Sequence, residues 1–70
     1  MMELKTKIWM TGALEWFAYI GDGEVYLGGR EVPYPLQDGD TWKNRFGDVF
    51  RVIGGEIVLL GRSGRPGEHW

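Results

Sequence analysis

The chain has 70 residues, a net charge of −2 and no cysteine. This length predicts a single domain, and the absence of cysteine excludes disulfides and a cysteine-built zinc site. A domain this small buries only about 60% of the surface of its unfolded chain, so the four Trp, three Tyr and three Phe must supply much of the core. Because no apolar run approaches the roughly 20 residues that cross a bilayer, and no secretory signal is recognisable, we expect a cytoplasmic protein without membrane contacts.

Residues 4–10 alternate in polarity. One face carries Leu4, Thr6, Ile8 and Met10, and the other carries Lys5, Lys7 and Trp9. A period of two is typical of a half-buried strand, and Thr11-Gly12 would end a helix early. This stretch therefore predicts a strand.

Residues 14–28 predict a hairpin around Gly21-Asp22-Gly23. A two-residue loop at Asp22-Gly23 pairs Ile20 with Val25 and Ala18 with Leu27. One face is then wholly apolar and the other aromatic: the first holds Leu14, Trp16, Ala18, Ile20, Val25 and Leu27, and the second holds Phe17, Tyr19 and Tyr26. A three-residue loop would instead place Phe17 and Tyr19 with Val25 and Leu27, because a one-residue slip exchanges the faces. We favour the first arrangement because its inner face is purely apolar.

The middle of the chain predicts short elements. Residues 30–34 suggest a short edge strand, since Pro33 and Pro35 donate no hydrogen bond to a neighbouring strand. Residues 37–40, Gln-Asp-Gly-Asp, predict a turn. Residues 41–46 predict one short helical turn, in which Trp42 and Phe46 would meet at positions i and i+4 and Gly47 would end the turn in the left-handed conformation.

Residues 48–61 give the clearest pattern, two apolar runs separated by Gly54-Gly55. A type I′ loop needs positive φ at both central residues, which glycine adopts without steric cost. Counting outward from the loop pairs Ile53–Glu56, Val52–Ile57, Arg51–Val58, Phe50–Leu59 and Val49–Leu60. One face of this hairpin is then wholly apolar and carries Phe50, Val52, Ile57 and Leu59.

These elements predict an all-β domain over residues 1–61: a small antiparallel barrel of five to six strands, SH3-like, with an OB-like barrel or an open meander sheet as alternatives. Closure suits a small chain because it removes exposed strand edges. Residues 62–70 carry two glycines and no periodicity, which predicts a flexible tail.

The sequence offers little to an enzyme. Its one serine, Ser63, and its one histidine, His69, lie in the predicted tail, which would not hold a nucleophile and a base together. Asp38 and Asp40 form only a fragment of a calcium loop, and no glycine pair matches a phosphate loop. We therefore expect no enzymatic activity, no cofactor and no metal.

Two sets of side chains are candidates for partner binding. The aromatic candidates are Trp9, Phe17, Tyr19, Tyr26, Tyr34 and Trp42, and the basic ones are Lys43, Arg45 and Arg51. Exposed aromatic side chains on a sheet anchor protein interfaces or stack nucleic-acid bases. The favoured hypothesis is a protein-binding module, a small regulatory adaptor or inhibitor, or a self-associating domain. The alternative is single-stranded nucleic-acid binding, which the acidic balance of the chain disfavours.

Overall fold

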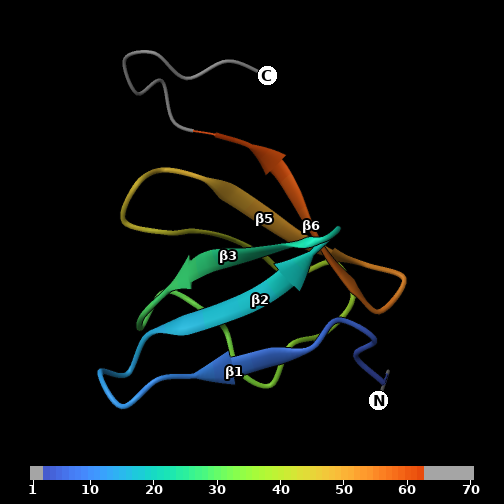
Figure 1. The fold of residues 1–70 in the computed structure, drawn as a ribbon. Helices are drawn as coiled ribbons and strands as arrows, with labels where there is room; N and C mark the ends of the chain where they lie inside the picture. Colours follow the sequence, from blue (N-terminus) through green and yellow to red (C-terminus); the bar gives the residue numbers. More distant parts are fainter. Residues whose placement is uncertain (1–2, 63–70) are drawn as a thin grey trace.

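The computed structural model describes residues 3–62 and contains six strands and no helix in that range (Figure 1). The strands are β1 (Ile8–Met10), β2 (Trp16–Ile20), β3 (Gly23–Gly28), β4 (Thr41–Lys43), β5 (Val49–Ile53) and β6 (Glu56–Gly61). They form two three-stranded antiparallel sheets, β1-β2-β3 and β4-β5-β6. The predicted tail lies almost entirely outside the described residues. Within the described residues, no helix is long and apolar enough to cross a membrane.

The β5–β6 hairpin follows its turn chemistry. Gly54 and Gly55 have φ of 60° and 83°, the signs of a type I′ loop. The pairs from Ile53–Glu56 to Phe50–Leu59 confirm the predicted register. At the far end a bulge pairs Val49 with Gly61 instead of Leu60, because the bulge adds one residue to β6.

The β2–β3 hairpin has the predicted faces but a different register. The loop is Gly21-Asp22, with Gly21 at φ 66°, so Ile20 pairs with Gly23 and Ala18 with Val25. Both predicted loops were wrong, because glycine takes the positive φ at the first loop position, as in a type II′ turn. A shift of two residues keeps the side chains of both strands on their predicted faces, since the period of a strand is two. Leu14, predicted on the core face, precedes β2 and is exposed.

Two predicted local elements were wrong. Residues 30–34 form turns and not a strand, and Val32 in this segment is buried in the core. Residues 41–43 form β4 in place of a helical turn. The reason is that Trp42, opposite Phe50 in the neighbouring strand, points inward and stacks on its ring at 5.7 Å. Gly47 does have a left-handed φ of 87°, in a turn between strands.

One hydrophobic core lies between the two sheets. Its buried side chains come from both sheets and from the segment between β3 and β4: Ala18, Leu27, Val32, Leu36, Trp42, Phe50, Val52 and Ile57. Leu4 and Ile8 pack against this core, although only the second half of the predicted 4–10 strand is regular. The two sheets do not close into a barrel, so the all-β class is confirmed while closure is not observed.

Candidate partner-binding surface

Five aromatic rings form a continuous row on the outer face of the β1-β2-β3 sheet. The cross-strand pairs Trp9–Phe17 and Phe17–Tyr26 place three of them side by side. The row runs Tyr19, Trp9, Phe17, Tyr26 and Phe46, with successive ring centroids 4.8, 6.1, 5.4 and 5.5 Å apart. We call these five residues the aromatic row. Such contacts contribute about 0.5–1.5 kcal/mol per pair beyond burial, so the rings support one another.

The aromatic row lies on the opposite side of its sheet from the core. Ala18 and Leu27 of the same strands are fully buried on the inner side. In the row, Tyr19 is 49% exposed and Phe46 is 42% exposed, and the other three rings are half-buried. The rings therefore present a partly exposed apolar surface on the side of the sheet away from the core.

Arg45 covers one end of the row. Its guanidinium carbon lies 4.9 Å from the Tyr26 ring centroid and 5.4 Å from that of Phe46, within the range of a cation–π contact. Its Nη2 atom donates to Glu15 Oε2 at 2.8 Å. Partial burial, followed by the neighbouring Glu15 carboxylate, raises the pKa of the Tyr26 phenol, and the positive charge of Arg45 opposes this rise.

The buried Asn44 side chain positions Arg45 and Phe46. Its Oδ1 atom accepts hydrogen bonds from the backbone N–H groups of Phe46 and Asp48, at 3.0 and 2.9 Å. Its Nδ2 atom donates to the Tyr26 carbonyl oxygen at 3.0 Å and to Asp48 Oδ2 at 3.1 Å. A loop of the second sheet is thereby fixed against β3 of the first, and this contact brings Phe46 to the aromatic row.

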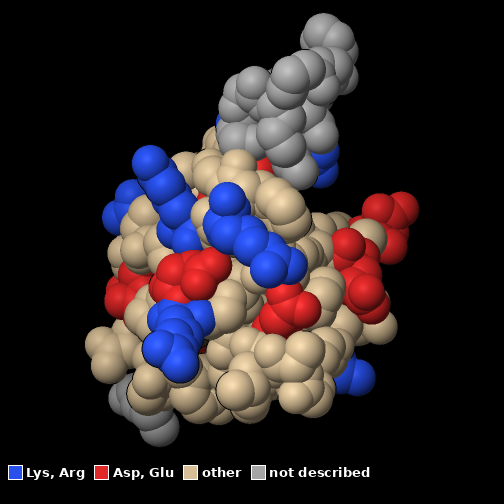
Figure 2. Space-filling model, turned by 90° about the vertical axis from the view of Figure 1, so that its left-hand side faces the viewer, with Lys and Arg blue, Asp and Glu red and all other residues tan. Residues whose placement is uncertain are grey.

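A polar hollow of about 570 Å³ adjoins this end of the row, lined by Leu14, Glu15, Tyr26, Arg30, Glu31 and Arg45 among others. Leu14, at its rim, is 67% exposed and has an unusual φ of 61°. The strand connections at the left of Figure 1 lie on this side, and Figure 2 shows basic and acidic groups interspersed over it. Mixed charge gives this end of the molecule no field of a single sign.

The structure groups four of the predicted aromatic candidates with one basic candidate: Trp9, Phe17, Tyr19, Tyr26 and Arg45. Tyr34 lies elsewhere, stacked on Trp16 with ring centroids 5.1 Å apart. Trp42 is buried in the core and offers no surface to a partner. Lys43 and Arg51 are exposed on the β4-β5-β6 sheet.

Sequence reasoning missed Phe46 and Glu15. Phe46 was assigned to a helical turn, although Asn44 and Gly47 are residues typical of a turn between strands. Such a turn would have projected Arg45 and Phe46 outward. Nothing in the sequence places Glu15 beside Arg45, because thirty positions separate them.

Neither a metal site nor similarity to known proteins assigns a function to this surface. Among residues 3–62, no group of three or more His, Cys, Asp or Glu side chains could hold a metal ion. No family model, curated protein or solved structure matches the chain.

Proposed function

We propose that this chain is a non-catalytic protein-binding module, a small regulatory adaptor or inhibitor, that contacts its partner through the aromatic row. The observation that carries the proposal is the unbroken series of rings from Tyr19 to Phe46 on the face turned away from the core. Tyr and Trp are enriched among the residues that dominate protein interfaces. The proposal includes an SH3-like arrangement, which the two three-stranded sheets around one core support. It also includes a cytoplasmic location.

Single-stranded nucleic-acid binding is the second candidate. The near-parallel Trp9 and Phe17 rings, 19° apart, favour it because bases stack on such platforms. Lys7 and Arg45 would supply positive charge. Against it, Glu24 lies opposite Tyr19 on the same face, and Arg45 is already paired with Glu15. A backbone of phosphates would meet these carboxylates, so a protein partner fits the charge better.

Site-directed photo-crosslinking tests the proposal. A photoreactive phenylalanine analogue replaces Tyr19 in one variant and Tyr34 in another; both side chains are exposed tyrosines, but only Tyr19 belongs to the aromatic row. In lysate of the source cells, the Tyr19 probe should capture a defined protein that Tyr34 does not. A probe at Phe46 should capture the same protein, because the two ends of one surface should meet one partner.

Two further measurements separate the alternatives. Fluorescence titration with oligothymidylate at low salt should show no micromolar binding. Sedimentation of the free chain should show whether it self-associates, and so whether the captured protein is a second copy of the chain. Salt-sensitive oligonucleotide binding that quenches Trp9 would favour the nucleic-acid function. Equal capture at Tyr19 and Tyr34 would overturn the proposed role of the aromatic row.

A further inference from the structure

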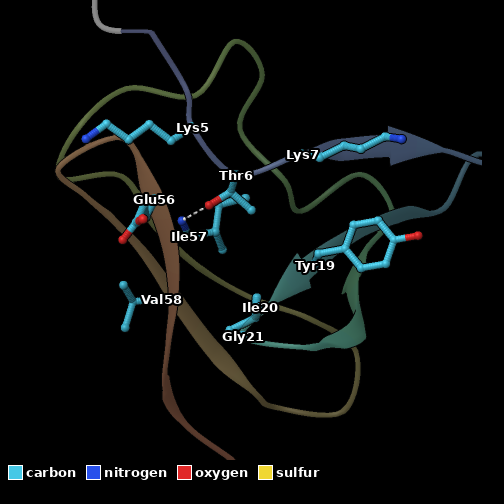
Figure 3. Close-up of a pocket in the computed structure, with 9 residues that line it drawn as sticks. All are labelled: Lys5, Thr6, Lys7, Tyr19, Ile20, Gly21, Glu56, Ile57 and Val58. Atoms are coloured by element: carbon cyan, nitrogen blue, oxygen red, sulfur yellow. Dashed lines mark hydrogen bonds between the residues drawn. The ribbon is translucent and has the colours of Figure 1, made fainter.

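A groove lies where the two sheets fail to close. It runs between the end of β2 and the start of β6, has a volume of about 530 Å³, and passes beneath residues 5–7 (Figure 3). Tyr19, Ile20 and Gly21 form one wall. The opposite wall is the strand from Glu56 to Val58. The groove is thus an open seam between two sheets that share a core.

Residues 5–7 bridge this seam at one end. Lys5 N donates to the Gly55 carbonyl oxygen at 2.6 Å, and Thr6 Oγ1 accepts from Ile57 N at 2.9 Å. On the other side, Tyr19 N donates to the Lys7 carbonyl oxygen at 3.4 Å. The N-terminal segment therefore passes from one sheet to the other and satisfies only the beginning of the β6 edge.

The rest of the β6 edge forms no hydrogen bond to a third strand in the part of the chain that the structure describes. β6 pairs with β5 alone, as the outer strand of its sheet. Since antiparallel strands alternate the direction of their backbone groups, the N–H and C=O of Leu59 point away from β5, as the N–H of Ile57 does. No hydrogen bond joins Leu59 to another described segment on that side. Such an edge is a template for a further strand.

Charge defines what could lie along this edge. Lys5 and Lys7 are both exposed, and neither forms a salt bridge with a described carboxylate. In Figure 3 the Lys7 side chain extends beside Tyr19, while Lys5 extends toward the side that carries Glu56. Glu56 is the acidic residue among those that line the groove. At the Lys7 end, next to the aromatic row, Glu24 lies opposite Tyr19 in the next strand, and no described carboxylate forms a salt bridge with Lys7.

We propose that this groove binds an extended acidic segment of a protein partner, which adds to the open edge of β6 and places a carboxylate at Lys7. The inference rests on the proposed protein-binding function and names the chemistry of the partner. Strand addition supplies the backbone hydrogen bonds, and the side-chain contacts supply the selectivity. A nucleic acid would satisfy Lys7 but has no peptide groups for Leu59, so the observations favour a peptide.

The test uses the isotope-labelled full chain and a short synthetic peptide of alternating Thr and Glu. The peptide should shift the amide resonances of residues 5–7 and 57–59. Lys7→Glu should weaken its affinity at least about fivefold, whereas Lys43→Glu, the same charge change on the other sheet, should weaken it less than about twofold. N-methylation of every second peptide residue should weaken binding at least about tenfold, because it blocks the strand hydrogen bonds.

Four results with the peptide or the free chain would each overturn the inference, besides the Phe46→Ser result given below. They are equal binding of an alternating Thr-Lys peptide, undiminished binding of the N-methylated peptide, competition by oligothymidylate, and a dimer of the free chain joined through β6. Phe46→Ser separates this inference from the proposed function. It removes the distant end of the aromatic row and should leave peptide binding unchanged. Loss of the crosslinked partner with retained peptide binding would support both proposals, whereas loss of peptide binding in Phe46→Ser would refute the groove.

Discussion

Asn44 Nδ2 donates a hydrogen bond to the Tyr26 carbonyl oxygen, and this contact joins the loop between β4 and β5 to strand β3 of the other sheet. Asn44 is buried, and both polar atoms of its side chain are bonded. The same contact determines the aromatic row, because Phe46 reaches Tyr26 only when the loop is held against β3. Stability and the proposed interface are therefore coupled through one amide.

Asn44→Ala should destabilise the domain by about 3 kcal/mol, because each buried polar group left without a partner costs about 1–3 kcal/mol. That is a large part of the total for a small domain. Urea unfolding followed by Trp fluorescence measures the loss. Lys43→Ala, an exposed neighbour, is the control and should change stability by less than about 0.5 kcal/mol. Equal effects of the two variants would show that the Asn44 amide does not hold the loop.

The two loop glycines of the β5–β6 hairpin should respond differently to alanine. Both have positive φ, which costs an alanine about 1–2 kcal/mol. A Cβ on Gly54 would meet nothing within 4 Å, whereas one on Gly55 would lie 2.9 Å from the Glu3 carbonyl oxygen. Gly55→Ala should therefore cost at least about 1 kcal/mol more than Gly54→Ala in denaturant unfolding. Equal losses would mean that the N-terminal segment does not pack on this loop in solution.

The hairpins were predictable from the sequence because their signals are local. Gly54-Gly55 and the alternation around it defined both the loop and the pairs. In the β2–β3 hairpin the faces of the favoured arrangement were predictable, but the loops Gly21-Asp22 and Asp22-Gly23 give two registers that share those faces. The pattern alone could not choose among them.

The errors lay where distant residues decide the local structure. Trp42 is compatible with a helical turn or a strand, and its packing on Phe50 selects the strand. The position of Phe46 follows from that strand and from the Asn44–Tyr26 contact. Four of the six aromatic candidates, Trp9, Phe17, Tyr19 and Tyr26, were therefore predictable as a sheet face. The end of the row that Arg45 and Glu15 complete was not.

The aromatic row should behave as a surface in stability measurements. Phe46→Ser removes a ring that is 42% exposed and should cost about 1–2 kcal/mol. Phe50→Ala, at a fully buried position of the core, should cost about 3–5 kcal/mol. Thermal unfolding by circular dichroism compares the two. A loss in Phe46→Ser as large as in Phe50→Ala would show that the row is a second core and would weaken its proposed role in binding.

Leu14 adopts a backbone conformation that favours glycine. Its φ is 61°, which strains the backbone of a residue with a Cβ atom, and its side chain is 67% exposed, so little burial offsets that strain. Leu14→Gly should therefore stabilise the domain by about 0.5–1 kcal/mol, net of the greater freedom of glycine in the unfolded chain. Ala13→Gly, without positive φ, should instead destabilise by about 0.5–1 kcal/mol. Chemical denaturation distinguishes these signs, and destabilisation by both would contradict the strain.

The raised pKa of Tyr26 makes stability depend on pH in the alkaline range. The folded protein holds the phenolic proton above pH 10.0, where a tyrosine in the unfolded chain loses it. This contribution is fully present below pH 10.0 and is lost as the pH rises through the folded pKa. Tyr26→Phe should accordingly lose less stability than the parent chain above pH 10.0.

In a spectrophotometric titration of tyrosinate, Glu15→Gln should lower the Tyr26 pKa, because it removes the carboxylate that opposes ionisation, and Arg45→Gln should raise it. Shifts of the opposite sign would show that this pair does not face the Tyr26 phenol.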